Sequence, residues 1–204
     1  LAPFLHYGGS GLLTQVAATL VGLIILVWSA DRFVLGAAAL ARNFGMSTLM
    51  IGLTVVSLGT SAPEIFVSLS AALSGAPELA VGNVLGSNIA NIALVLAITA
   101  MIAPIPIQKV VLHHTLPVLI LITAIAGFCL YDLYLGQFDA VILLISLLIL
   151  GVVVYFNPSA ALDEGDEFEQ ARLSNLAASA WFLFSLVLLI GSSKLLVWGA
   201  TGLA

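Results

Sequence analysis

The stretch LGTSAPE, from Leu58 to Glu64, places a carboxylate in the middle of an apolar segment long enough to cross a membrane. LMIGLTVVS precedes it and IFVSLSAALSG follows it, and no other charged residue occurs between Arg42 and Glu78. A charged side chain at the centre of a bilayer costs at least about 2.5–3.5 kcal/mol, so an acid at that depth is a functional hypothesis by default. Glu64 is therefore the first candidate site residue.

The composition is typical of a polytopic membrane protein. Of the 204 residues, 62% are hydrophobic and 7% are charged, whereas a soluble domain carries roughly a quarter charged residues. The net charge of -5 comes largely from the acidic run DEGDEFE at 163–169 and gives no indication of nucleic-acid binding. The single cysteine, Cys129, excludes an internal disulfide and a cysteine metal cluster.

Six segments are apolar over about the 20 residues that a helix needs to cross the hydrocarbon core. They are residues 12–41, 49–73, 79–103, 112–130, 138–156 and 176–204. We therefore predict an all-α polytopic membrane protein with six transmembrane helices. The connections are short except for the acidic link, residues 157–175, which is long and polar and is the only plausible hinge between larger units.

The basic residues of the connections predict the orientation in the membrane. Arg42, Lys109 and Arg172 fall in the first, third and fifth connections, which lie on one side. The opposite connections contain Glu78 and Asp132 but no Lys or Arg. Because basic loops stay in the cytoplasm, we expect the odd connections, including the acidic link, to be cytoplasmic and the N-terminus to be outside.

An internal repeat relates the first and the last predicted helix. ILVWSADRFVLGAAALA (25–41) aligns with LLIGSSKLLVWGATGLA (188–204). The identical pairs are Leu26/Leu189, Ser29/Ser192, Gly36/Gly199, Ala37/Ala200, Leu40/Leu203 and Ala41/Ala204. The two copies are five helices apart, and an odd number places them in opposite orientations, which is the arrangement of inverted-repeat transporters.

The segment around Glu64 has a polar side. On a helix, residues three or four apart share one face, and this spacing joins Ser57, Thr60, Ser61, Glu64 and Ser68 into one polar stripe. A serine-rich face of this kind also binds membrane helices together through hydrogen bonds. The stripe is thus either a packing device or a binding surface.

Pro63 favours the second interpretation. Its missing backbone N–H leaves the carbonyl of Gly59 without its usual donor, and the resulting bend is expected to turn the carbonyl of Thr60 out of helical geometry. A carboxylate, hydroxyls and unpaired carbonyls then lie together. These are the hard oxygen ligands that Ca²⁺ and similar cations prefer.

The next predicted helix repeats the polar theme in GNVLGSNIANIALVLA, residues 82–97. Ser87 and Asn91 lie four apart on one face, and Asn83 and Asn88 add two further amides. Three asparagines within nine residues of an apolar helix are expected to face a partner helix or water. An interhelical amide network and a set of cation ligands both fit this pattern.

GLTVVSLGTSAPEIFVSLSAAL followed by AVGNVLGSNIANIALVLAITA resembles the first signature repeat of the cation/calcium antiporter superfamily, in particular its bacterial sodium/calcium-exchanger-like members. Both parts of the signature, residues 52–97, occur in order on consecutive predicted helices. The resemblance implies ten transmembrane helices in two inverted halves, each with a glutamate-bearing motif. It further implies secondary active transport by alternating access in a bacterial inner membrane, with Na⁺ or H⁺ exchanged for Ca²⁺ or a similar divalent cation, and neither enzymatic activity nor a cofactor.

The resemblance also implies roles for residues. Glu64 matches the cation-binding glutamate of that family, and Thr60 matches its ligand through a hydroxyl and a carbonyl. Ser57 and Ser61 match oxygen donors to flanking sodium sites. On the following helix, the matching donors are Ser87 and Asn91.

The chain departs from the family pattern because the second signature repeat and its glutamate are absent. We therefore expect residues 1–156 to be the first inverted repeat, 157–175 a cytoplasmic linker and 176–204 the first helix of a second repeat. The expected partners are inorganic cations, the lipid bilayer and a missing second half of the same protein. The sequence leaves the driving ion and the identity of the divalent cation open.

Two other classes of function compete with this prediction. One is a cation channel or a purely structural membrane assembly module. The other is an intramembrane hydrolase in which Ser61 or Ser87 is activated by His113 or His114. A nucleophile needs its base within about 3 Å, and both histidines are predicted at a helix end while the serines lie deeper.

Overall fold

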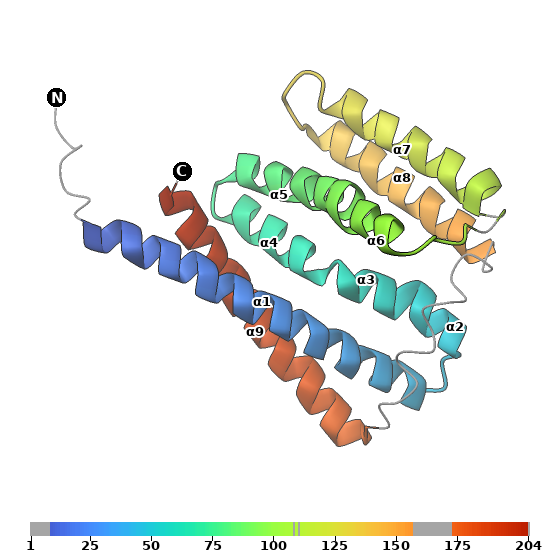
Figure 1. The fold of residues 1–204 in the computed structure, drawn as a ribbon, viewed down its shortest axis with the longest axis horizontal. Helices are drawn as coiled ribbons and strands as arrows, with labels where there is room; N and C mark the ends of the chain where they lie inside the picture. The colour runs from blue at the N-terminus through green and yellow to red at the C-terminus, as the bar shows by residue number, and fades with distance from the viewer. Residues whose placement is uncertain (1–8, 108, 110, 157–172, 204) are drawn as a thin grey trace. The chain divides into compact units, whose positions relative to one another are not determined.

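The computed structural model describes residues 9–107, 109, 111–156 and 173–203, and every element in these ranges is helical (Figure 1). In chain order the elements are α1 (Gly9–Asn43), α2 (Thr48–Met50), η1 (Ile51–Val56), α3 (Ser57–Thr60), α4 (Ala62–Leu73), α5 (Pro77–Ile89), η2 (Ala90–Leu96), α6 (Ala97–Ile102), η3 (Val111–Thr115), α7 (Leu116–Cys129), α8 (Gln137–Phe156) and α9 (Asn175–Leu203). The three η segments are π-helical turns. Most of the acidic link, with Arg172, lies outside the described residues.

The helices lie at the positions of the predicted membrane spans. Five are long and apolar enough to cross a bilayer: Gly11–Asn43, Pro77–Ile102, Val111–Cys129, Gln137–Phe156 and Asn175–Leu203. A sixth span is broken into Thr54–Thr60 and Ala62–Leu73, which are inclined to each other by 52°. The described chain therefore has five membrane-long helices, or six if the bent pair is counted as one span.

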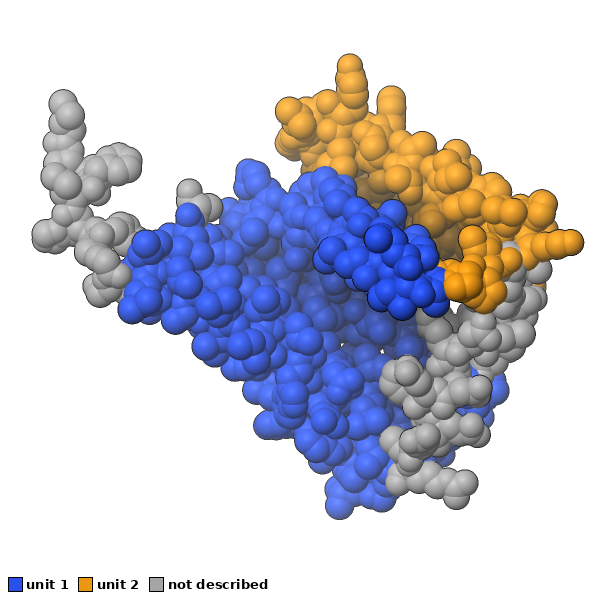
Figure 2. Space-filling model, viewed as in Figure 1, with its two compact units in different colours: residues 1–103, 167–204 blue, residues 104–166 orange. Residues whose placement is uncertain are grey.

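The chain divides into two compact units, which Figure 2 distinguishes by colour. Unit 1 comprises Leu1–Ala103 and Glu167–Ala204, and its described helices are α1 to α6 and α9. Unit 2 comprises Pro104–Asp166 and contains η3, α7 and α8. Helix α9 thus belongs to the same unit as the first helices, although more than 70 residues separate it from α6.

Within unit 1, α1 and α9 pack against each other in antiparallel directions, and glycines set how closely they approach. A Cβ added at Gly36 would lie 2.7 Å from the backbone nitrogen of Phe182, and one added at Gly199 would lie 2.8 Å from that of Thr19. If the alignment that pairs Gly36 with Gly199 is continued six residues towards the N-terminus, it also pairs Thr19 with Phe182. The contacts are therefore reciprocal, as they are between elements related by a two-fold axis.

A cation–π cluster also joins these two helices. The Arg32 guanidinium on α1 lies 5.8 Å from the ring centroid of Trp28 on its own helix and 5.5 Å from that of Trp181 on α9. Arg32 Nε is 3.7 Å from a carboxylate oxygen of its neighbour Asp31. Attraction between a cation and an indole face is worth about 0.5–1 kcal/mol at exposed sites, so Arg32 contributes to the α1–α9 contact.

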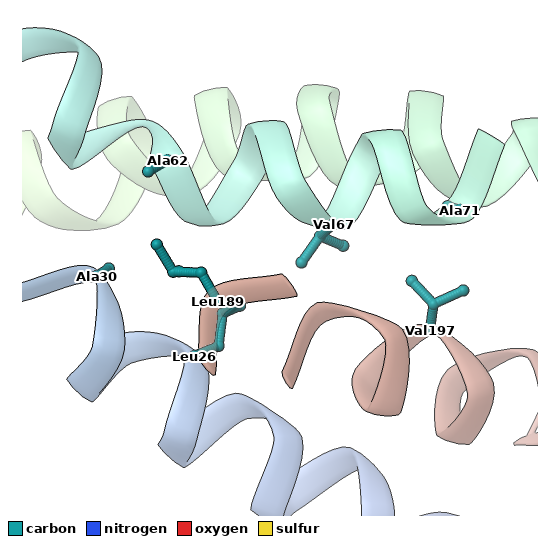
Figure 3. Packing of buried hydrophobic residues seen from close by; sticks show 7 residues of the cluster. All are labelled: Leu26, Ala30, Ala62, Val67, Ala71, Leu189 and Val197. Carbon is teal, nitrogen blue, oxygen red and sulfur yellow. The ribbon is translucent and has the colours of Figure 1, made fainter. Parts of the chain in front are cut away.

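Helix α4 lies across the α1–α9 pair and closes the main hydrophobic cluster of unit 1 (Figure 3). Its buried members come from all three helices: Leu26 and Ala30 from α1, Ala62, Val67 and Ala71 from α4, and Leu189 and Val197 from α9. Three of the seven are alanines, whose small side chains let the helix backbones approach closely. The cluster fixes α4, and with it Glu64, on the rest of the unit.

The short connections of unit 1 use ordinary turn chemistry. After α1, Gly45 adopts a positive φ of 86° and Ser47 caps α2 by accepting a hydrogen bond from the backbone N–H of Met50. After α4, Gly75 adopts a φ of 76° and Pro77 opens α5. Glycine tolerates positive φ, and proline is well suited to the first turn of a helix. These tight turns place α4 and α5 side by side (Figure 1).

Unit 2 is a helical hairpin of α7 and α8. Leu133 in the turn has a positive φ of 60°. Carboxylates order this turn: Asp132 accepts from the backbone N–H of Tyr134 at 3.1 Å, and Asp139 accepts from that of Gly136 at 2.8 Å. Both aspartates therefore have local partners in the described residues of the hairpin.

Candidate functional site

The site begins at the break between α3 and α4. Ser61 leaves helical geometry with φ -89° and ψ 1°, and Pro63 lies in the first turn of α4. Proline is accepted there because the first N–H groups of a helix have no intrahelical partner. The bend of 52° confirms the break expected at Pro63, and it makes Glu64 a residue of the first turn of α4.

Close packing against α1 supports the bend. Gly59, at the end of the first half-span, is buried, and a Cβ added to it would lie 2.6 Å from a methyl group of Val34. Val34 is itself buried on α1 and belongs to a second apolar cluster that includes Val56. Glycine at position 59 therefore lets α3 lie directly on α1.

A π-helical segment adjoins the site on each side. η1 ends at Val56, immediately before α3, and η2 starts at Ala90, immediately after α5. In a π-turn the backbone N–H donates to the carbonyl five residues earlier, instead of four residues earlier as in an α-helix. Such turns occur frequently at functional sites. Ser57 illustrates this geometry because both its hydroxyl and its backbone N–H donate to the carbonyl of Gly52, five residues earlier.

Glu64 makes an asymmetric set of contacts. Its Oε1 accepts a hydrogen bond from the hydroxyl of Ser87 on α5, at 3.3 Å. Its Oε2 is buried and has no hydrogen-bond partner among the described residues. A buried polar atom without a partner is costly, and a bound cation offsets that cost. One oxygen of the carboxylate is thus held by protein, and the other is available to a ligand.

A second polar contact between α4 and α5 lies one turn away. The side-chain amide of Asn83 donates to the backbone oxygen of Glu64 at 3.2 Å and to the hydroxyl of Ser68 at 3.0 Å. Ser68 in turn donates to the backbone oxygen of Ala80 at 3.4 Å. The pattern of three asparagines indicated a partner helix for these amides, and for Asn83 that partner is α4.

The other four candidate ligands are exposed in the described structure. Ser57, Thr60 and Ser61 are exposed around the break, and the hydroxyl of Thr60 donates to the carbonyl of Ser57 at 3.1 Å. Asn91 is exposed on η2, one turn beyond Ser87. Of the six candidates, the structure joins Glu64 to Ser87 by a direct hydrogen bond. Ser57 and Thr60 bond to their own helix.

Carboxylates are scarce around this site. Among the described residues, no group of three or more His, Cys, Asp and Glu side chains lies close enough to hold a metal ion. The donors around Glu64 are hydroxyls, amides and backbone carbonyls, which suit a hard cation.

The two histidines considered as bases for Ser61 or Ser87 belong to unit 2, where a ring nitrogen of His113 lies 2.8 Å from the backbone oxygen of Lys109.

These features define a class of protein. Membrane-long apolar helices and a broken span beside the half-buried Glu64 belong to an integral membrane protein with a candidate cation site at a discontinuous helix. The sodium/calcium exchanger protein family matches residues 14–159. The chain belongs to this family, whose members are transporters rather than enzymes.

Curated relatives and a solved structure agree with this assignment. The chain is 42% identical over 199 residues to the putative antiporter CaxA of Alkalimonas amylolytica, and 38% identical over 201 residues to the inner membrane protein YrbG of Escherichia coli strain K12. Each match covers 95% of this chain and 62% of the relative. A structure of the sodium-calcium exchanger NCX_Mj, soaked with Na⁺ and Sr²⁺, matches at 32% identity with a TM-score of 0.56, over 95% of this chain and 62% of that one. The chain thus spans about three fifths of the length of these proteins.

Proposed function

We propose that the protein is a secondary active antiporter that exchanges Ca²⁺, or a similar divalent cation, for Na⁺ or H⁺ by alternating access. The observation that carries the proposal is the state of Glu64: Oε1 is held by Ser87, while Oε2 is buried without a partner in the described structure. A carboxylate in an apolar, membrane-long segment is costly, and a cation bound at Oε2 offsets that cost. The names of CaxA and NCX_Mj support the same activity.

We assign the cation ligands to both helices next to the break. Glu64 supplies the charge, and Thr60 supplies a hydroxyl and a carbonyl where the bend exposes its backbone. Ser87 and Asn91 supply donors from α5 and η2. The hydroxyls of Ser57 and Ser61 serve flanking sodium sites, and that of Ser57 rotates away from the carbonyl of Gly52 to do so.

This ligand set forms one half of a binding site. Ca²⁺ takes 6–8 oxygen ligands, and two carboxylates are needed to neutralise its charge, whereas Glu64 is the one carboxylate among the six candidate ligands. We propose that residues 1–156 are the first half of a ten-helix inverted repeat and that 176–204 begin the second half, after a cytoplasmic linker at 157–175. The reciprocal packing of Gly36 and Gly199 supports this arrangement.

The proposal includes an orientation and a place in the cell. Arg42 at the end of α1 and Lys109 before η3 are basic residues of the first and third connections, and we place them in the cytoplasm with the N-terminus outside. The name of YrbG, an inner membrane protein, supports a bacterial inner membrane. The transported cations are substrates, and we propose no cofactor.

Reconstitution of the whole gene product into liposomes tests this function. We expect ⁴⁵Ca²⁺ uptake that depends on an outward gradient of Na⁺ or of H⁺. The ion whose gradient supports uptake is the driving ion. Dissipating the gradient with an ionophore serves as the control, and uptake should then stop. Equal uptake with and without a gradient would instead identify a channel, and no uptake under either gradient would contradict the proposal.

A further inference from the structure

Asn83 connects α5 to the residue that bears the site carboxylate. Its amide nitrogen donates to the backbone oxygen of Glu64 at 3.2 Å and to the hydroxyl of Ser68 at 3.0 Å. All three residues are half-buried, and both hydrogen bonds cross from one helix to the other. A side-chain amide nitrogen carries two hydrogens, so a single nitrogen can serve both acceptors at once.

Two sets of side-chain hydrogen bonds join α5 to α4. Asn83 and Ser87 lie four residues apart on one face of α5, and Glu64 and Ser68 lie four apart on the facing side of α4. In the first set, the hydroxyl of Ser87 donates to Oε1 of Glu64. In the second set, the amide of Asn83 donates to the backbone oxygen of Glu64 and to the hydroxyl of Ser68. Glu64 is therefore fixed at two points from the same neighbouring helix.

We propose that Asn83 is a positioning residue for the cation site, an inference that rests on the function proposed above. By fixing the register of α5 against α4, Asn83 keeps the hydroxyl of Ser87 on Oε1 and leaves Oε2 to the cation. Without this amide, small shifts of α5 along α4 lengthen the 3.3 Å contact between Ser87 and Glu64. The carboxylate then samples several rotamers, and a bound cation must order it again at the expense of affinity.

A matched residue separates this role from ordinary helix pairing. Asn43, at the end of α1, also donates from its side-chain amide to a backbone oxygen of a distant segment, that of Leu173, at 3.0 Å. Asn43 donates the same kind of hydrogen bond as Asn83 donates to Glu64, but Leu173 is not a candidate cation ligand. Replacing either asparagine by leucine retains most of the volume and removes the donor.

The test measures Ca²⁺ concentration dependence in proteoliposomes of the whole gene product. We expect Asn83→Leu to raise the half-saturating Ca²⁺ concentration by about three- to tenfold, the scale of one lost hydrogen bond, with a maximal rate within about twofold of wild type. Asn43→Leu should leave the half-saturating concentration unchanged. If Asn83→Leu lowers only the amount of folded protein or the maximal rate, Asn83 is a packing residue and the inference is wrong.

Two further variants keep the inference testable if Asn83→Leu fails to fold. Ser68→Ala removes one acceptor of Asn83 without touching Glu64, and it should raise the half-saturating concentration in the same direction. In the Ser87→Ala background, the effect of Ser68→Ala should shrink, because both act through the carboxylate of Glu64. An unchanged half-saturating concentration in Ser68→Ala, or full additivity, would overturn the inference.

The outcomes also distinguish this inference from the proposed function. If Glu64→Gln abolishes exchange but Asn83→Leu and Ser68→Ala bind Ca²⁺ like wild type, the positioning role alone fails. If Glu64→Gln itself exchanges normally, the proposed function fails, and the positioning role fails with it.

Discussion

Replacing Glu64 by glutamine is expected to abolish gradient-driven Ca²⁺ uptake while leaving the protein inserted in the membrane. The amide retains the shape of the carboxylate and can still accept a hydrogen bond from Ser87, but it lacks the charge that offsets a desolvated cation. Removing one partner of a buried charge pair costs about 3–5 kcal/mol, so we expect a loss of at least about 100-fold in uptake at limiting Ca²⁺. The measurement is initial ⁴⁵Ca²⁺ uptake into proteoliposomes of the whole gene product.

Glu78→Gln provides the matched control for this experiment. Glu78 lies in the first turn of α5, as Glu64 lies in the first turn of α4, but its side chain is exposed. The same chemical change at Glu78 should leave uptake within about twofold of wild type, because exposed charges at helix ends contribute less than about 1 kcal/mol. Near-normal uptake by a well-expressed Glu64→Gln protein would refute the assignment of Glu64.

The 204-residue chain, reconstituted alone, is expected to show no Ca²⁺ uptake driven by Na⁺ or H⁺. Its candidate ligands include one carboxylate, that of Glu64, for a cation that takes 6–8 oxygens. No residue of α5, η2 or α6 is buried in the described structure, and most of their large apolar side chains are exposed. Two copies of this chain could form a symmetric site only if they were inserted in opposite orientations. The basic residues all lie in connections on one side of the membrane, which disfavours opposite orientations.

The reconstitution must include the whole gene product in parallel liposomes as the positive control. The readout is ⁴⁵Ca²⁺ uptake with an outward Na⁺ gradient and then with a proton gradient. If the 204-residue chain takes up Ca²⁺ under either gradient, and loses that uptake in Glu64→Gln, these residues are sufficient and the half-site account is wrong.

Local signals in the sequence predicted much of the fold. Apolar length alone located the spans, and Pro63 located the break in the second one, because both are properties of a few consecutive residues. The internal repeat predicted an inverted relation of the first and last helices, which the reciprocal packing of Gly36 and Gly199 supports. The resemblance of 52–97 to the exchanger signature predicted the family, which the match over residues 14–159 confirms.

The contacts within the site depend on tertiary register and were harder to predict. A straight helix would carry an unbroken polar stripe, but the chain bends at Ser61 and interrupts it. The Glu64 carboxylate therefore contacts Ser87 on α5, and in the described structure it has no hydrogen bond to the hydroxyls of its own stripe. Asn83 had no distinguishing signal among three asparagines, because only the packing of α5 on α4 selects it. The π-turns on either side of the site likewise follow from packing, since no residue type marks them.

The central claim, that Glu64 binds the transported cation through its unpartnered oxygen, is tested most directly by locating the ion. Crystals of the whole gene product soaked in Sr²⁺, a Ca²⁺ surrogate with a usable anomalous signal, should show a peak about 2.3–2.7 Å from Oε2 of Glu64. The same ion should contact oxygens of Thr60. A fully occupied Sr²⁺ peak elsewhere in the membrane region, with Oε2 of Glu64 still without a ligand, would contradict the account.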